Sequence, residues 1–552
     1  MSKIVIIGGV AGGAGVAARL RRLDEKAEII LLEKGEYISY ANCGLPYYIG
    51  DTITQREKLF VQTVSGFRQR FRIDIRTRSE AVGLFPERKT ILIRETGGGR
   101  EYEESYDKLV LSPGASPIVP DIPGINIQGI FTLRDVHDMD RIKKHIMETG
   151  AGNALIVGGG FIGLEMAENL TMAGLEVDMV EKTTQVMPSL DPEMANHIHR
   201  KLHENGISLH LGCAVTEFVP CDDGIEAHLE NGERIRISIV LLCMGVRPNI
   251  ALAKEAGLRI GSLGGIEVNG FMQTSDPDIY ALGDAVEIPH LLLGRNVLLP
   301  LAGPANKEAR ITADNLILGN HRTYKGCIGS SITKVFDLQA ATVGLTEKQL
   351  KREGLPYIAS HTHSASHASY YPSSKMMDIK LLFHPESGRI WGAQIIGAEG
   401  ADKRIEMIAQ TILHGGTVND LCEAEQAYAP PFSSAKDPVN MAGFVAENIL
   451  SGRCRVIQWD EWLQRDPSDL MLLDVRTTEE YRAGHLPNAV NMELDHIREQ
   501  LDQLPKDKDI VLYCAIGLRA YVAYRILAQN GFTRIANLSG GYRTCHTAMQ
   551  RY

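Results

Sequence analysis

Two cysteines in this sequence have neighbours that could make their thiols reactive. Cys43 lies in the run SYANCGLPY of residues 39–47, with no cysteine partner at CxxC or CxxxxC spacing. Cys514 opens the run CAIGLR of residues 514–519. A thiol reacts as its thiolate, whose pKa is lowered by nearby positive charge or hydrogen-bond donors. The two cysteines together indicate sulfur chemistry.

The elements around Cys514 predict how its thiolate is held. Residues 510–513 predict a strand and residues 518–529 a helix, so Cys514 would lie in a nest of backbone N–H groups at a helix N-terminus. Gly517 permits a tight loop, and Arg519 adds a fixed positive charge. Such a loop suits a thiolate or persulfide, although Cys514 as a core thiol stays an alternative. Cys545 is interpreted as structural.

A glycine-rich turn precedes Cys43 and predicts one nucleotide site. Residues 3–7 predict a buried strand, residues 8–13 (GGVAGG) a turn, and the stretch to Leu23 a helix. The turn departs from GxGxxG at Val10, but its glycines still let backbone N–H groups approach a pyrophosphate. A second strand, residues 29–32, ends at Glu33, whose carboxylate could hold a ribose hydroxyl pair.

A second unit of the same kind follows about 150 residues later. A strand at 154–157, the complete signature GGGFIG at 158–163, a helix at 164–173 and a strand at 177–180 lead to Glu181. A carboxylate there favours NADH, because it repels the 2′-phosphate of NADPH. Lys182 follows directly, so NADPH stays possible.

Length and composition bound the class of protein. A chain of 552 residues predicts three or four domains. The net charge of −10 argues against a nucleic-acid binder, and no apolar run approaches the roughly 20 residues of a membrane helix. The first residues read as a buried strand and not a signal peptide. Nine scattered cysteines suit a reducing compartment, so we expect a cytoplasmic enzyme.

These motifs in combination resemble a known family. The two glycine-rich turns, Glu33, the strand of residues 109–114 (LVLSPG) and the turn YALGD of residues 280–284 resemble FAD-dependent pyridine nucleotide-disulfide oxidoreductases over residues 1–450. Glutathione reductase-like members carry a cysteine pair, whereas Cys43 is alone. Ser39, Asn42 and Cys43, followed by Pro46 and Tyr47, resemble the coenzyme A-disulfide reductase branch. Residues 457–552 resemble a single rhodanese (sulfurtransferase) domain, from LDVR at 473–476 and GHLPNA at 484–489 to the Cys514 loop.

The resemblance implies an α/β fold of four parts. These are two Rossmann-like nucleotide-binding domains, an α+β dimerisation domain and a C-terminal α/β rhodanese domain. The implied limits are 1–120 with 245–325 for FAD, 121–244 for NAD, 326–450 for dimerisation and 457–552 for rhodanese. A homodimer is implied, in which each chain helps to build its partner's active site.

The predicted site residues fall into three groups. The cofactor-binding residues are Gly8, Gly9, Val10, Ala11, Gly12, Gly13, Glu33, Lys34, Asn42, Ser112, Pro113, Gly114, Gly283, Asp284, Gly158, Gly160, Phe161, Ile162, Gly163, Glu181 and Gly245. The catalytic residues are Cys43, Cys514 and Arg519, to which the resemblance adds Tyr370 and Tyr428. The coenzyme A-binding residues implied by the resemblance are Arg19, Arg22, Ser39, Asn42, Tyr371 and Lys436. Arg19 and Arg22 share one helix face and could grip a polyanion.

The function predicted from these residues is reduction of coenzyme A persulfide, polysulfide or coenzyme A disulfide with NADH. A polarised flavin and nearby donors would stabilise the Cys43 thiolate. One alternative is an NADH oxidase or peroxidase in which Cys43 cycles through sulfenic acid. Another is a redox-sensing or sulfur-carrier interaction protein. The run of His361, His363 and His367 resembles a metal site only superficially, and we expect no metal there.

Overall fold

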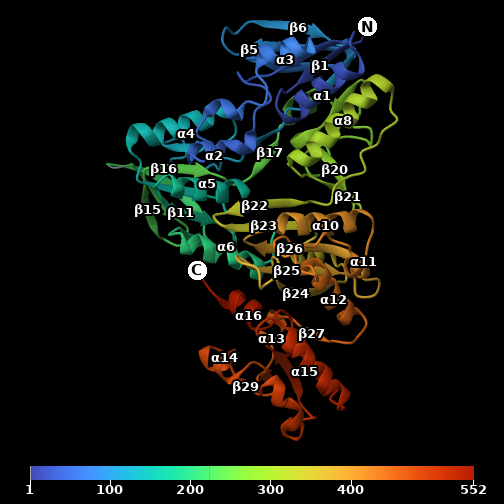
Figure 1. The fold of residues 1–552 in the computed structure, drawn as a ribbon. Helices are drawn as coiled ribbons and strands as arrows, with labels where there is room; N and C mark the ends of the chain where they lie inside the picture. The colour runs from blue at the N-terminus through green and yellow to red at the C-terminus, as the bar shows by residue number, and fades with distance from the viewer. Residues whose placement is uncertain (1, 223) are drawn as a thin grey trace. The chain divides into compact units, whose positions relative to one another are not determined.

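The computed structural model describes residues 2–222 and 224–552 and contains two compact units (Figure 1). The first unit contains the residues up to Lys182 and Gly212–Cys327. The second comprises Thr183–Leu211 and Ile328–Tyr552. No described helix is long and apolar enough to cross a lipid bilayer.

The first unit begins with a parallel sheet of order β19-β7-β1-β2-β3. Parallel strands are covered on both faces, so the central strand β1 carries a continuous apolar run, with Ile4, Val5 and Ile6 fully buried. The helix α1 connects β1 to β2, and α8 packs against it. The bounds are β1 (Lys3–Ile7), α1 (Ala11–Leu23), β2 (Glu28–Leu32), β3 (Asp74–Arg76), β7 (Lys108–Leu111), β19 (Ile279–Ala281) and α8 (Ala302–Leu318).

A second parallel array in this unit repeats the arrangement. Strands β11, β10, β16 and β9 are hydrogen-bonded in that order, and α5 connects β10 to β11. The bounds are β9 (Ile130–Thr132), β10 (Asn153–Val157), α5 (Phe161–Met172), β11 (Glu176–Glu181) and β16 (Ile239–Leu242). Both predicted strand–turn–helix–strand units are therefore confirmed.

The second unit contains an antiparallel sheet of order β22-β23-β26-β25-β24. Helices α10 and α12 pack on this sheet, and α6 and α9 contribute side chains to it. The bounds are α6 (Pro192–Glu204), β22 (Ser331–Val335), β23 (Leu338–Gly344), α9 (Glu347–Glu353), β24 (Ile358–Ala365), β25 (Met376–Phe383), β26 (Ile390–Gly397), α10 (Ala401–Leu413) and α12 (Pro438–Leu450). This is the predicted α+β domain.

The C-terminal part of this unit is a parallel sheet of order β27-β31-β30-β28-β29. The predicted helix at 518–529 is confirmed as α15, which follows the Cys514 loop. The bounds are β27 (Val456–Ile457), β28 (Leu470–Asp474), α14 (Thr478–Ala483), β29 (Ala489–Asn491), β30 (Asp509–Tyr513), α15 (Leu518–Gln529), β31 (Ile535–Leu538) and α16 (Gly541–Met549). The predicted fold class is confirmed, whereas the predicted domain limits stay predictions.

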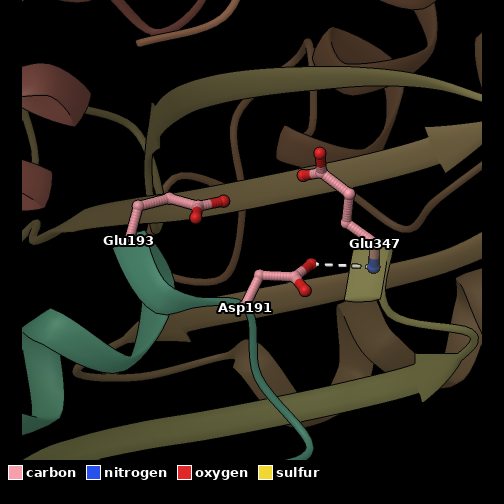
Figure 2. Close-up of side chains that lie close together, drawn as sticks. All are labelled: Asp191, Glu193 and Glu347. Atoms are coloured by element: carbon pink, nitrogen blue, oxygen red, sulfur yellow. Dashed lines mark hydrogen bonds between the residues drawn. The ribbon is translucent and has the colours of Figure 1, made fainter. Parts of the chain in front are cut away.

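A buried ammonium organises the antiparallel sheet. Asp191, Glu193 and Glu347 turn their carboxylates toward one another (Figure 2). The fully buried Lys380 of β25 lies among them, with Nζ 2.5 Å from Glu193, 2.5 Å from Glu347 and 3.0 Å from Asp191. Burial alone would raise the pKa of Glu347, but the charge of Lys380 outweighs it and lowers this pKa to about 2. The position that a metal ion would take is filled by the lysine.

Replacing Lys380 by Met should destabilise the second unit strongly. The variant leaves three buried carboxylates without their cation, and breaking such a pair costs about 3–5 kcal/mol. Urea unfolding, with hydrogen exchange in β25 to identify the transition, measures the loss. Lys351→Met is the matched control, because Lys351 also bonds Glu347 (2.9 Å) but is half exposed. It should cost less than about 1 kcal/mol, and equal losses for the two variants would contradict the role of Lys380.

Candidate active sites

The Cys43 loop is tied to the first glycine-rich turn. Cys43 lies in a single 3-10 turn, Asn42–Gly44, directly before the short helix α2 (Leu45–Ile49). The backbone N–H of Ser39 donates to the carbonyl of Gly9 (2.9 Å), and Ser39 adopts a left-handed conformation with φ of +47°. The predicted pairing of this loop with a nucleotide turn therefore has a direct backbone link.

The protein groups around Cys43 raise the pKa of its thiol. Cys43 is exposed at the surface, yet partial burial of the thiol contributes most to the rise. The negative charges of Glu165 and Asp284 add to it. We expected a thiolate of lowered pKa, and the structure shows that neighbouring protein charges act in the opposite direction. Within the described part of the protein, only a backbone hydrogen bond at Cys43 acts to lower this pKa.

Glu165 is a candidate residue that the motifs did not reveal. It lies on α5, two residues after Gly163, and Tyr47 donates a hydrogen bond to it at 3.4 Å. Burial raises the pKa of Glu165 to about 7, where a carboxyl can hold or release a proton. The sequence signal was a single carboxylate within the apolar stretch 161–167 (FIGLEMA).

The two glycine-rich turns have the same geometry. A Cβ on Gly13 would lie 1.8 Å from the carbonyl oxygen of Gly8, and a Cβ on Gly163 would lie 2.0 Å from that of Gly158. Only glycine permits this close approach between helix and strand. The other predicted residues of the turns lie at the helix starts. Val10 and Gly160 are the N-caps, and Ala11, Phe161 and Ile162 begin the helices.

The predicted ribose carboxylates also hydrogen-bond to these turns. Glu33 accepts from the backbone N–H of Gly9 and of Gly35, both at 2.8 Å. Glu181 accepts from the backbone N–H of Gly159 at 2.8 Å. A hollow of about 440 Å³ opens beside Lys34 at the end of β2. In both strand–turn–helix–strand units the carboxylate that follows the second strand therefore lies against the turn at a helix N-terminus, the arrangement that nucleotide-binding turns require.

A second carboxylate that sequence reasoning missed, Glu308 of α8, lies against the turn after β19. The backbone N–H of Gly283 donates to Glu308 of α8 at 2.8 Å. Burial raises the pKa of Glu308 to about 7, and it also raises the pKa of the neighbouring Asp284. Ser112 is near this turn, because a Cβ on Gly283 would lie 3.9 Å from its Oγ. The structure thus brings the predicted residues of strands β7 and β19 together.

The remaining predicted residues of the first unit follow β7 and β16 or lie on α1. Asn249 donates its backbone N–H to the carbonyl of Gly114 and its side-chain amide to that of Pro113, both at 2.9 Å, and Gly245 follows β16. Arg19 of α1 pairs with Asp314 at 2.8 Å, whereas Arg22 is exposed. A phosphate bound by Arg19 would share its guanidinium with Asp314.

The predicted aromatic residues of the second unit lie at the surface. The hydroxyls of Tyr370 and Tyr428 are 3.1 Å apart, and both rings are exposed, as are Tyr371 and Lys436. The buried Arg404 fixes both segments. It donates to the carbonyl of Ser366 at 2.8 Å and to Asp437 at 2.9 Å. These contacts position the aromatic residues without testing their predicted roles.

The Cys514 loop has the predicted strand–loop–helix form. Cys514 is buried, and its Sγ accepts a hydrogen bond from the backbone N–H of Gly517 at 3.1 Å. Gly517 has a φ of +103°. An N–H group directed at sulfur stabilises negative charge there, as a thiolate or persulfide requires.

The positive charge at this loop is paired, which the sequence did not predict. Arg519 donates to both oxygens of Glu480 at 2.7 Å. These bonds lower the pKa of Glu480 to about 2, so it is ionised at neutral pH. Arg519 therefore faces the loop as part of an ion pair and not as an unbalanced charge.

Models of known families cover most of the chain. Residues 2–312 match the pyridine nucleotide-disulphide oxidoreductase family, residues 330–438 its dimerisation domain, and residues 459–547 the rhodanese-like domain. A coenzyme A disulfide reductase of Staphylococcus epidermidis is 34% identical over 447 residues, which is 81% of this chain and 100% of that protein.

Solved structures resemble the whole chain. The reduced CoADR-RHD of Bacillus anthracis has 47% identity and a TM-score of 0.97, over 99% of this chain and 98% of that one. An NAD-dependent persulfide reductase from A. fulgidus has 37% identity and a TM-score of 0.92, over 98% and 99%. The chain therefore belongs to the pyridine nucleotide-disulphide oxidoreductase family, with that family's dimerisation domain and a rhodanese-like domain.

Proposed function

We propose that this protein uses NAD(P)H to reduce coenzyme A persulfide, polysulfide or coenzyme A disulfide at Cys43. One observation carries the proposal: among the nine cysteines, all described, Cys43 is the exposed one, and its loop is tied to a nucleotide turn. The relatives named for coenzyme A disulfide and persulfide reduction support this substrate class.

The first unit fits FAD and a nicotinamide nucleotide. The helix N-termini of α1 and α5, with Glu33 and Glu181 beside them, offer N–H donors to phosphates and carboxylates to riboses. Bound FAD supplies the relay of two electrons from NAD(P)H to sulfur. Glu181 supports a preference for NADH over NADPH.

The chemistry at Cys43 is a thiol–disulfide exchange followed by reduction. The Cys43 thiolate attacks the inner sulfur of a coenzyme A persulfide, a mixed disulfide forms, and hydrosulfide leaves. Two electrons from NAD(P)H then break the mixed disulfide, which releases coenzyme A and restores the thiolate. With coenzyme A disulfide, both leaving groups are coenzyme A thiols.

Glu165 supplies the proton that a leaving thiolate requires. Its raised pKa, near 7, keeps part of the population protonated at neutral pH. It also interacts electrostatically with the Cys43 thiol. We propose that Glu165 protonates the leaving sulfur and regains its proton from solvent.

The rhodanese-like domain delivers sulfane sulfur. Cys514 accepts sulfur from a donor as a persulfide, whose charge the N–H of Gly517 stabilises. Coenzyme A would carry this sulfur from Cys514 to Cys43, with Arg19, Arg22, Ser39 and Asn42 contributing to its site. In a homodimer, Tyr370, Tyr371, Tyr428 and Lys436 would complete the partner's site. The occurrence of both domains in one chain supports this transfer.

Replacing Cys43 by Ser should abolish NADH oxidation with every sulfur substrate. The variant lacks the nucleophile, whereas its nucleotide turns are unchanged. Stopped-flow absorbance of the flavin during NADH addition separates the two half-reactions, and reduction of the flavin by NADH should persist. Native mass spectrometry of the wild type should find FAD and a coenzyme A adduct at Cys43. Full activity of the variant would refute the proposal.

Replacing Cys514 by Ser should abolish use of polysulfide and spare small persulfides. Polysulfide would need loading at Cys514, whereas a small persulfide would reach Cys43 directly. The measurement is the rate of NADH oxidation with polysulfide, compared with the rate with a small persulfide. Cys545→Ser is the control, since Cys545 is fully buried in the same domain. Equal loss on both substrates would rule out the delivery role.

The pH dependence should report Glu165. Its pKa is raised from 4.5 to about 7, so the proton donor is present below pH 7 and is lost as the pH rises above it. The rate of coenzyme A release should therefore fall above pH 7, and Glu165→Gln should be slower by about 10²-fold or more without this decline. Tyr47→Phe removes the hydrogen bond from Tyr47 that lowers the pKa of Glu165. In this variant the rate of coenzyme A release should therefore begin to fall at a higher pH. An unchanged profile in Glu165→Gln would exclude the role.

A further inference from the structure

The first turn of α16 contacts the Cys514 loop through its backbone. The N–H of Tyr542 donates to the carbonyl of Cys514 at 2.8 Å, and the N–H of Arg543 donates to that of Ala515 at 3.0 Å. The first N–H groups of a helix have no partner within the helix. Here two of them hold the backbone of the loop that carries the thiol.

Gly541 makes this contact possible. A Cβ at this residue would lie 2.4 Å from the carbonyl oxygen of Cys514, and its φ of +61° disfavours other residues. The start of α16 and the Cys514 loop therefore have little room to move relative to each other. A displacement of α16 must also displace the loop.

The same turn is fixed on its other side to the antiparallel sheet. Arg543 forms a bidentate pair with Asp378 of β25, with Nε 2.6 Å from Oδ1 and Nη2 2.8 Å from Oδ2. Asp378 is buried. Although burial opposes ionisation, the hydrogen bonds from Arg543 and His363 hold the pKa of Asp378 well below 3.8.

His363 of β24 contacts Asp378 and the start of α16 on either side of Arg543. Its Nδ1 hydrogen-bonds to Asp378, and its Nε2 lies 2.9 Å from Oγ1 of Thr544 and 3.1 Å from the carbonyl of Gly540. We call Asp378, His363 and Arg543 the β25–α16 latch. It connects the antiparallel sheet to the first turn of α16, which holds the Cys514 loop.

We propose that Arg543 is a positioning residue for sulfur transfer at Cys514. Through the latch it holds α16, and α16 holds the carbonyls of Cys514 and Ala515, so that the N–H of Gly517 stays directed at Sγ. The antiparallel sheet thereby fixes the orientation of the Cys514 loop. The proposal deepens the proposed function and rests on it for the role of Cys514.

The test compares Arg543→Gln, Arg543→Lys and Asp378→Asn in the FAD-loaded full chain. Arg534→Gln is the matched control, because Arg534 pairs with Asp509 at 2.8 Å in the same domain but contacts neither α16 nor the loop. Hydrogen exchange by mass spectrometry should show amides 514–519 exchanging at least about tenfold faster in Arg543→Gln and Asp378→Asn. Strands β28 and β30 should keep their protection, and the control should match the wild type.

Steady-state kinetics give the second readout. With polysulfide as donor, kcat should fall about five- to tenfold while KM stays within about twofold, because the loop loses its orientation and not its donor site. Arg543→Lys keeps one charged bond to Asp378 and should recover part of kcat. Reduction of coenzyme A disulfide, which bypasses Cys514, should be unchanged in all variants.

Two results would overturn the proposal. Unchanged exchange at 514–519 would show that the latch does not hold the loop, and faster exchange throughout residues 457–552 would show a general structural role. Failure of the proposed function is distinguished by Cys514→Ser. If that variant uses polysulfide normally, sulfur delivery is wrong, while the exchange data still decide whether the latch holds the loop.

Discussion

Two opposite charges buried on one strand constrain the second unit more than any other interaction. Asp378 and Lys380 are two residues apart on β25, so their side chains share a face of the sheet. A buried charge is tolerated only when it is paired and hydrogen-bonded, because removal from water costs several kcal/mol for each ion. The sheet must therefore bring partners of both signs to neighbouring positions.

The partners come from segments distant in the sequence. Lys380 pairs with residues at the start of α6 and the start of α9. Asp378 pairs with residues of β24 and α16. His361 of β24 connects the Lys380 group to the C-terminal sheet, since it lies 3.1 Å from Glu193 and 3.2 Å from Ser539, which follows β31. A shift of any of these segments would leave a buried charge without its partner, which a purely hydrophobic contact would not penalise in the same way. The buried charges thus specify how the C-terminal sheet docks.

Local signals explain what could be predicted from the sequence. Strands 3–7 and 154–157, the two glycine-rich turns and the Cys514 loop each depend on residues adjacent in the chain, and the structure has all of them. The missed features depend on distant partners. Arg543 meets Asp378 across 165 residues, and Gly283 meets Glu308 across 25. The pKa of Glu165 depends on burial that no motif encodes.

The ion pair between Arg519 and Glu480 has a kinetic consequence. A lone arginine at the mouth of the Cys514 loop would attract anions over a Debye length, about 8 Å at physiological salt. Because Arg519 donates to both oxygens of Glu480, the two opposite charges largely cancel at that distance. Sulfur donors therefore gain little electrostatic steering, and their encounter rate with Cys514 should depend only weakly on ionic strength.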